Sequence, residues 1–192
     1  MFRRDLLRAA VVGVALSLSL GVVARAADNP SLVLQVGGAH AGTVVIDLFA
    51  DVAPEHAKRI EQLVNEHAYD GVVFHRVIDG FMAQTGDVQF GKRDGDTSMA
   101  GMGGSSYPDL KAEFSDKPFA RGTVGMARSS SPNSANSQFF IMFAPAPHLN
   151  GQYTVIGQVT KGMDIVDAIK KGDAARNGLV TDPDYIVSAT IE

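Results

Sequence analysis

The sequence predicts a mainly β protein, a closed eight-stranded antiparallel β-barrel capped by two α-helices. Three observations support this fold class. The chain has 192 residues, an ordinary length for one domain. Eight short segments are rich in branched and aromatic residues, whereas only two segments show the helical spacing of apolar residues. Strands and helices do not alternate regularly, which excludes a doubly wound parallel sheet.

The first part of the predicted domain contains two strands and a helix. Residues 31–36 and 43–49 are rich in branched residues, and the GGAHAG segment between them is a turn. A helix is expected over 51–67, with Pro54 in its first turn. The apolar residues of this helix recur at helical spacing and form one face: Ala57, Ile60, Leu63, Val64 and His67.

Residues 72–87 are predicted to form a β-hairpin. With strand periodicity, Phe74, Arg76 and Ile78 alternate with His75 and Val77, and Asp79-Gly80 is typical of a two-residue hairpin turn. Arg76 lies on the first strand, where an arginine is most often a solvated side chain. His75 lies on the opposite face, and we expect it to be a buried residue with its hydrogen bonds satisfied.

The second half of the chain begins with a loop-rich stretch, about 88–121, followed by four strands and a helix. The strands are expected at 123–127, 137–143, 153–160 and 185–191, and the helix at 163–171, ended by Gly172. Side chains of a strand alternate between two faces. Within 137–143 we therefore expect Gln138 and Phe140 to line a pocket, and Phe139 and Ile141 to pack inside.

Residues 1–26 are expected to be a secretory signal peptide, and residues 27–192 the folded domain. Three arginines precede a short apolar run, and ARA at 24–26 fits a cleavage site. An uncleaved membrane anchor stays open, because the apolar run is nearly long enough to span a bilayer. Arg3-Arg4 resembles a twin-arginine signal, so Sec and twin-arginine export also stay open. Either route leads out of the cytoplasm, and the signal suggests a bacterial periplasm.

Composition and charge exclude several kinds of chemistry. The chain has no cysteine, so it has neither disulfides nor thiolate sites. Its formal charge is −4; residues 1–26 hold four Arg and one Asp and so contribute +3, which leaves the mature chain near −7. That charge argues against nucleic acid and anionic membranes as partners. The five histidines show no metal-ligand spacing, Ser129–Ser131 lack a nucleophile elbow, and the glycine-rich loop lacks a phosphate-binding ending. We expect no metal and no cofactor.

Two long motifs resemble the cyclophilin family of peptidyl-prolyl isomerases. They are FHRVIDGFMAQTGD at 74–87 and GTVGMARSSSPNSANSQFFIMF at 122–143, and the resemblance extends over 31–191. It implies the barrel architecture given above. Tyr153, where eukaryotic members have His, looks like the bacterial periplasmic branch.

The implied reaction needs neither a nucleophile nor a cofactor. Rotation about an amide bond faces a barrier of roughly 18–20 kcal/mol, and the twisted state localises the lone pair on the proline nitrogen. A donor aimed at that nitrogen and an apolar pocket for the ring are sufficient. The resemblance assigns the catalytic role to Arg76 and implies a substrate-binding set: Phe81, Met82, Gln84, Ala127, Arg128, Gln138, Phe140, His148, Leu149 and Tyr153.

Within that set, Phe81, Met82 and Phe140 would form walls of the proline pocket, completed by Leu149. Gln84 and Gln138 would hold the substrate backbone, and Ala127 with Arg128 would border the residues before proline.

Two residues at the rim of the site differ from those that many members of the family carry. His148 stands where many eukaryotic members have Trp, so weak cyclosporin binding is expected. Many relatives carry Asn where Arg128 stands.

The sequence therefore predicts a monomeric periplasmic prolyl isomerase that acts on proline-containing segments of exported proteins with broad specificity. After cleavage of the signal we expect no stable membrane association. The alternative is a non-catalytic module that binds proline-containing peptides, or a periplasmic holdase chaperone. The clients, the oligomeric state and the importance of the protein to the cell are left open by the sequence.

Overall fold

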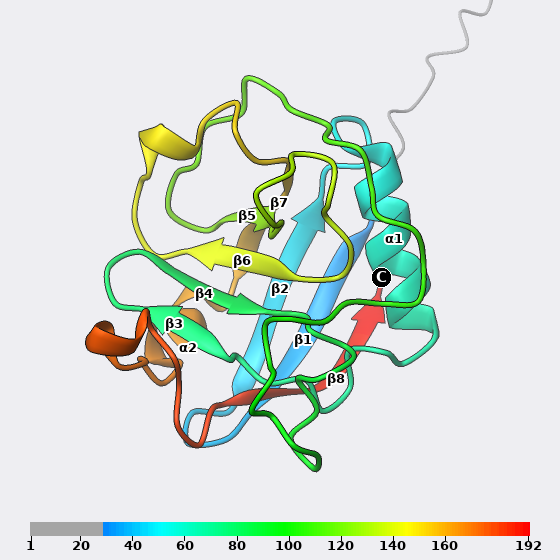
Figure 1. Ribbon diagram of the computed structural model, residues 1–192. Coiled ribbons are helices and arrows are strands. Elements are labelled where there is room, and N and C mark those ends of the chain that lie inside the picture. Colours follow the sequence, from blue (N-terminus) through cyan, green and yellow to red (C-terminus); the bar gives the residue numbers. More distant parts are fainter. Residues whose placement is uncertain (1–28) are drawn as a thin grey trace, which may run out of the picture.

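The computed structural model describes residues 29–192, which form one eight-stranded antiparallel sheet with two α-helices (Figure 1). The predicted signal peptide, its cleavage site and the predicted start at Ala27 lie outside the described residues. The strands are β1 (Ser31–Gly37), β2 (Gly42–Leu48), β3 (Arg76–Ile78), β4 (Met82–Thr85), β5 (Thr123–Met126), β6 (Phe139–Met142), β7 (Val155–Lys161) and β8 (Tyr185–Ile191). The helices are α1 (Pro54–Asn65) and α2 (Met163–Ala168), with short 3₁₀ turns η1 (Pro147–Leu149) and η2 (Ala174–Arg176).

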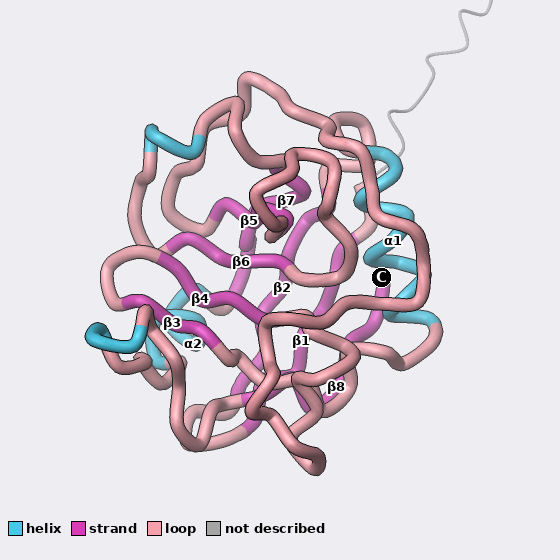
Figure 2. The backbone as a smooth tube through the Cα atoms, viewed as in Figure 1, coloured by secondary structure: helices cyan, strands magenta, loops and turns pink. Residues whose placement is uncertain are grey.

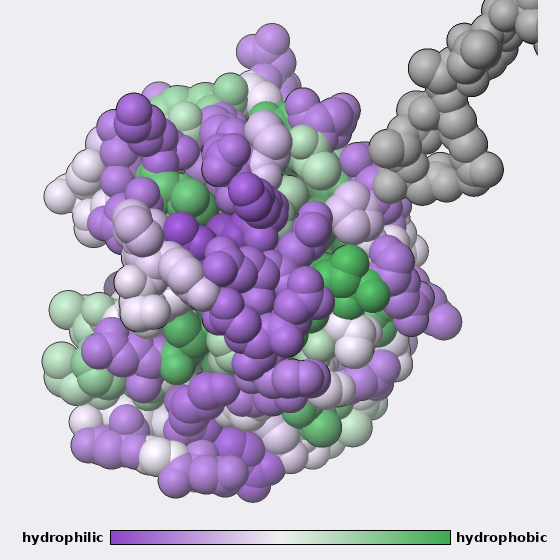
Figure 3. Space-filling model, turned by 90° about the vertical axis from the view of Figure 1, so that its right-hand side faces the viewer, coloured by the Kyte–Doolittle hydropathy of each residue, from purple (hydrophilic) through white to green (hydrophobic). Residues whose placement is uncertain are grey.

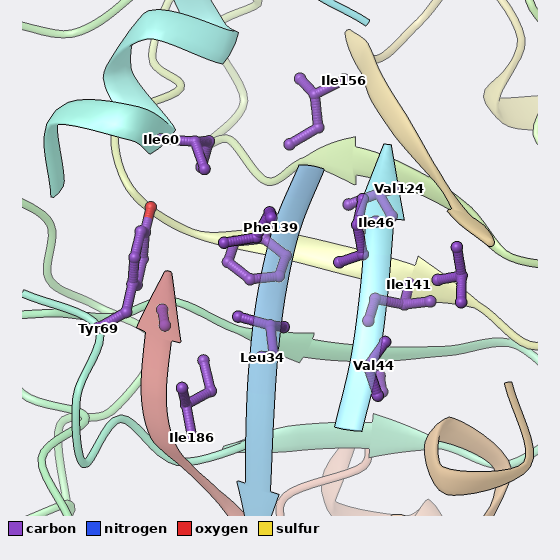
Figure 4. Packing of buried hydrophobic residues seen from close by; sticks show 14 of the residues in the cluster. Leu34, Val44, Ile46, Ile60, Tyr69, Val124, Phe139, Ile141, Ile156 and Ile186 are labelled. Carbon is purple, nitrogen blue, oxygen red and sulfur yellow. The ribbon is translucent and has the colours of Figure 1, made fainter. Parts of the chain in front are cut away.

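The sheet is strongly curled, so that its two halves face one another. The strand order is β3-β4-β6-β5-β7-β2-β1-β8. Strands β4 and β6 cross over β1 and β2 at a steep angle, and the core side chains lie between the two layers (Figures 1 and 4). Helix α1 packs against β8, and α2 packs against β2. Much of the remaining chain is loop, including the long connection between β4 and β5 (Figure 2).

The prediction of a closed barrel was wrong. Strands β3 and β8 form the two edges of the sheet and do not pair along their lengths. The outer edge of β3, which is only three residues long, is covered by the 178–180 segment, because Val77 N donates to Gly178 O (2.8 Å) and Val180 N donates to His75 O (3.1 Å). On its side away from β1, strand β8 therefore meets residues 71–74 and not β3; there Ile186 N donates to Val72 O (2.8 Å). The result is a curled half-barrel.

The hydrophobic core divides into two clusters along β6. Phe139 and Ile141 belong to the main cluster between the two layers, together with residues such as Leu34, Ile60 and Ile186 (Figure 4). The second cluster lies on the other face of β6 and comprises Met82, Phe119, Phe140, Met142, Ala146, Leu149 and Val155. The predicted alternation of β6 is therefore confirmed, although the strand begins at Phe139 and not at Ser137.

The helices are shorter than predicted. Helix α1 starts at Pro54, because Ala53 is not helical (φ −133°, ψ 66°), and it ends at Asn65. Four residues of its predicted apolar face are buried, whereas His67 lies beyond the helix, exposed and with positive φ. Helix α2 ends at Ala168, because Ile169 is extended and the next backbone N–H, that of Lys170, donates to the Asp184 carboxylate (2.9 Å).

The hairpin turn is one residue longer than predicted. Ile78 lies opposite Met82, so Asp79, Gly80 and Phe81 form a three-residue loop. Gly80 has φ +67°, a left-handed conformation that glycine adopts without strain. The extra residue places Phe81 at the tip, beside the cavity described below.

The face of the molecule that lies on the right in Figure 1 is mostly hydrophilic, with only small separate hydrophobic areas (Figure 3). None of the helices in the described part of the chain has the length and apolar character needed to cross a membrane.

Candidate active site

A cavity of about 180 Å³ collects most of the predicted site residues. It is lined by Arg76, Phe81, Met82, Gln84, Ala127, Arg128, Phe140, Leu149 and Tyr153. The two remaining residues lie at its border. Gln138 lines an adjoining cavity of about 540 Å³, which shares Gln84, Ala127 and Arg128 with the first. The exposed His148 ring stacks on Phe81 at 5.9 Å between ring centroids.

Strand register places the central residues of the cavity in one row. Arg76 of β3 pairs with Gln84 of β4, and Gln84 pairs with Phe140 of β6. Paired residues point to the same face of a sheet, so the three side chains emerge side by side. The row brings a guanidinium, an amide and an aromatic ring together.

The apolar side of the cavity is a packed aromatic group. Phe140 stacks on Phe119 (5.7 Å, 21°) and meets the edge of the Tyr153 ring (5.7 Å, 87°). Gly125, opposite Phe140, provides the space: a Cβ there would lie 2.6 Å from the Phe119 ring and 2.7 Å from the Phe140 ring. Phe119 was missed by the sequence analysis, because it lies in the long loop without any periodic signal.

Arg76 is held by neutral acceptors. Its Nη1 donates to Gln84 Oε1 (3.1 Å), and Asn177 accepts twice, from Nε through its carbonyl O (3.1 Å) and from Nη2 through Oδ1 (3.0 Å). Met82 Sδ lies 3.9 Å from Nη1. A guanidinium has five N–H donors, so two are left without an oxygen or nitrogen acceptor among residues 29–192.

The charge of Arg76 is retained and is not balanced locally. Partial burial lowers the pKa of its guanidinium from the ordinary value, opposed by a smaller contribution from Tyr153. An arginine nevertheless stays protonated at physiological pH. Within the described residues, no carboxylate lies at ion-pair distance from it.

A chain of amide hydrogen bonds connects Arg76 with the neighbouring loop. Gln84 Nε2 donates to Gln138 Oε1 (2.9 Å), and Gln138 Nε2 donates to Gly101 O (3.0 Å) and Gly103 O (2.8 Å). Both amide hydrogens of Gln138 are therefore used within the protein, whereas Gln84 has one N–H left. Of the two glutamines predicted to hold the substrate backbone, only Gln84 still has a donor available.

The loop that contains Gly101 and Gly103 is anchored by the carboxylate of Asp87, which is fully buried. Its Oδ1 accepts from Gln89 N (3.0 Å) and Phe90 N (2.9 Å), and its Oδ2 accepts from Gly101 N (2.7 Å) and Gly103 N (2.9 Å). Hydrogen bonds to a charged acceptor are stronger than neutral ones. The sequence analysis read this stretch as loop-rich and missed its buried anchor.

Arg128 is a second arginine at the cavity, held in a different way. Its guanidinium carbon lies 4.3 Å from the centroid of the Tyr153 ring. Its Nη2 donates to Gln152 O (3.0 Å), and its Nη1 donates to Ser129 O (2.9 Å). Carbonyls and an aromatic face fix this cation on the wall shared by the two cavities.

His75 differs from the prediction. It is 4% exposed, and neither ring nitrogen has a hydrogen-bond partner among residues 29–192. Burial lowers the pKa of His75 to about 4. The negative charge of Asp87, the Val73 backbone and the Gln138 side chain oppose this shift. Neither Val73 nor Gln138 makes a hydrogen bond of good geometry to the ring. His75 is thus a buried neutral imidazole behind the strand that carries Arg76.

Comparison with known proteins agrees with this architecture. The family described as "Cyclophilin type peptidyl-prolyl cis-trans isomerase/CLD" matches residues 32–191. A "Probable peptidyl-prolyl cis-trans isomerase" of Brucella suis is 58% identical over 187 residues, covering 96% of this chain and 94% of the relative. The "Peptidyl-prolyl cis-trans isomerase CYP18-1" of Arabidopsis thaliana is 41% identical over 130 residues, covering 68% and 78%.

Solved structures show the same fold. A cyclophilin-type isomerase from Cryptosporidium parvum, crystallised in the presence of the dipeptide Ala-Pro, has a TM-score of 0.71 at 25% identity and covers 84% of this chain and 98% of that chain. Cyclophilin AquaCyp293 from Hirschia baltica has a TM-score of 0.68 at 25% identity, covering 85% and 73%.

The curled antiparallel sheet, with an aromatic cavity beside an arginine that no carboxylate balances among residues 29–192, agrees with the cyclophilin fold of these structures. The chain belongs to the cyclophilin-type peptidyl-prolyl cis-trans isomerases, which interconvert the cis and trans forms of the bond before proline.

Proposed function

We propose that this isomerase acts on exported polypeptides in the periplasm, with Arg76 as its catalytic donor and the 180 Å³ cavity as the seat of the proline ring. The observation that carries this assignment is the position of the guanidinium. It lines the cavity, is anchored on two sides, and keeps N–H groups without an acceptor among residues 29–192.

Uncatalysed rotation before proline takes tens of seconds or longer. In the twisted state the proline nitrogen becomes pyramidal and carries a localised lone pair. A fixed N–H donor beside that nitrogen stabilises the twisted state more than the planar amide, because the planar amide has delocalised this lone pair. An acceleration of about 10⁵ requires roughly 7 kcal/mol.

The cavity supplies the apolar contacts for the proline ring. Phe81, Met82, Phe140 and Leu149 form its walls, and the remaining N–H of Gln84 can hold a substrate carbonyl. A relative crystallised in the presence of Ala-Pro supports proline-containing segments as ligands of this chain. The fixed charge of Arg128 beside both cavities favours acidic residues near the proline.

The test is cis–trans exchange of an Ala-Pro-Phe peptide, measured by NMR exchange spectroscopy with residues 27–192. In Arg76→Ala we expect turnover to fall at least about a hundredfold, which is roughly 2.7 kcal/mol, with an unchanged melting temperature. Arg93→Ala is the matched control, since it removes an exposed arginine outside the cavity and should leave turnover unchanged.

Near-normal catalysis in Arg76→Ala would remove this residue from the mechanism. Peptide binding by the wild-type protein without faster exchange would instead favour the alternative function, a non-catalytic proline-binding module or holdase.

The periplasmic location rests on the leader at residues 1–26. Fractionation of the native cells followed by N-terminal sequencing tests it, and the expected product is periplasmic and starts at Ala27. A membrane-bound product that retains the apolar run would support the uncleaved anchor. The monomeric state and the weak cyclosporin binding expected from His148 stay predictions.

A further inference from the structure

The residue that contacts Arg76 most extensively comes from a loop far away in the sequence. Asn177 follows the 3₁₀ turn η2, and its carbonyl O and Oδ1 accept from Nε and Nη2 of Arg76 (3.1 and 3.0 Å). One residue therefore occupies one edge of the guanidinium plane with two hydrogen bonds. Gln84 accepts from the other terminal nitrogen (3.1 Å), so the plane is fixed from two directions.

The backbone of Asn177 is shaped for this contact. Its φ is +55°, a left-handed conformation that Asn tolerates better than most residues. Gly178 follows with φ +79°, and a Cβ there would lie 2.5 Å from Ile78 Cγ1. Two consecutive left-handed residues turn both oxygens of Asn177 towards β3.

The loop is also attached to the strand that carries Arg76. Gly178 O accepts from Val77 N (2.8 Å), Val77 O accepts from Gly172 N (2.8 Å), and Gly178 N donates to Asp173 O (2.8 Å). Asn177 thus has a fixed position relative to Arg76, although its own side chain is exposed. A rigid acceptor next to a long, flexible side chain reduces the number of rotamers that the side chain can adopt.

We propose that Asn177 is a positioning residue for the isomerase reaction, which orients the Arg76 guanidinium so that its remaining N–H groups face the cavity. This inference rests on the proposed catalytic role of Arg76. We call the two hydrogen bonds from Arg76 to Asn177 the clamp. Both acceptors are neutral oxygens, so the clamp fixes the guanidinium without balancing its charge. The orientation is therefore present before the substrate binds, which is the condition under which a donor stabilises a transition state well.

The test compares Asn177→Gly with Asp182→Gly. Glycine keeps the left-handed backbone and the carbonyl at position 177 and removes the side chain, including the Oδ1 that accepts from Arg76. Asp182 is also left-handed (φ +49°), and its side chain has no hydrogen bond to the cavity residues, so this variant is a control for added backbone freedom. Exchange spectroscopy separates peptide affinity from turnover.

In Asn177→Gly we expect turnover to fall about tenfold, the size of one lost hydrogen bond to a charged group. The peptide Kd should stay within about twofold, and turnover in Asp182→Gly should be unchanged. Unchanged turnover in Asn177→Gly, or an equal loss in both variants, would overturn the proposal.

A spectroscopic measurement makes the result independent of catalysis. The ¹⁵N order parameter of Arg76 Nε should be high in the wild type and should drop in Asn177→Gly alone. Asn177→Asp retains an oxygen at the same place and should keep most of that order. An order parameter that is equally low in the wild type would refute the clamp. If the wild-type protein is ordered at Arg76 but does not accelerate exchange, the catalytic assignment fails and the clamp stands.

Discussion

The two neighbouring phenylalanines of β6 allow the cavity to be tested separately from the core. Phe139 is fully buried in the main cluster, where it meets Tyr69 edge-to-face at 5.7 Å, whereas Phe140 lines the cavity. Replacement of either by Leu shrinks the side chain but keeps it apolar, and should cost about 1–2 kcal/mol of unfolding free energy. In Phe140→Leu, however, a proline ring also loses a flat wall. If roughly 40 Å² of apolar contact is lost at about 25 cal/mol/Å², transition-state binding weakens by about 1 kcal/mol, or about fivefold in kcat/KM.

The measurements are urea unfolding for stability and the Ala-Pro-Phe exchange assay for kcat/KM. Both variants should unfold at similar urea concentrations, and only Phe140→Leu should lose activity. Phe139→Leu serves as the control for a general loss of rigidity. An equal loss of kcat/KM in both variants, or none in Phe140→Leu, would show that the Phe140 ring is ordinary packing and that the cavity was assigned incorrectly.

Two further predictions concern the surroundings of the cavity. His75 is neutral in the fold, with a pKa of about 4, whereas an unfolded histidine titrates near 6.5. The unfolded state takes up the proton first, so this contribution to stability is complete above about pH 6.5 and is lost as the pH falls towards 4. The unfolding free energies from urea titrations at pH 7 and pH 5 should differ by about 2 kcal/mol, and the difference should be smaller in His75→Asn. Asp87→Asn replaces one acceptor oxygen with a donor facing backbone N–H groups and should destabilise the fold by about 3 kcal/mol. In the same variant, hydrogen exchange at Gly101 and Gly103 should become faster; unchanged protection there would argue against Asp87 as the anchor of the loop.

The fold was largely predictable from the sequence, because its strands carry strong local signals. The alternation in β6 placed Phe139 and Phe140 on opposite faces correctly. Closure of the sheet was not predictable, since it depends on which backbone reaches the outer edge of β3. That place is taken by Gly178 and Val180, which lie in a loop without periodicity.

Most of the residues that line the cavity lie in the two long motifs at 74–87 and 122–143, whereas Leu149 and Tyr153 were expected from the resemblance outside them. Phe119, Asn177 and Asp87 were missed for physical reasons. Phe119 and Asn177 act through contacts between separate segments, such as Asn177 with Arg76 at a separation of 101 residues, and Asp87 acts through backbone N–H groups of an aperiodic loop up to 16 residues away. The only local signal was the Asn177-Gly178 pair, which is typical of left-handed backbone. It predicts a turn without indicating what the turn touches.

From the environments of Arg76 and His75 we expect the turnover and the stability of this protein to respond differently to pH. Carbonyl and amide oxygens hold the guanidinium, and no carboxylate in the described residues lies at ion-pair distance from it; in the proposed mechanism its full charge would therefore act on the developing lone pair. An acidic partner would have fixed the side chain equally well but would have weakened this interaction. Because an arginine does not titrate near neutrality, the donor itself is independent of pH. His75, one residue away, has a lowered pKa in the fold, so in acid the unfolded chain binds its proton more readily than the folded one does. Acidification therefore shifts the equilibrium towards the unfolded chain. Mild acid should therefore reduce the amount of folded enzyme before it changes the turnover of each folded molecule.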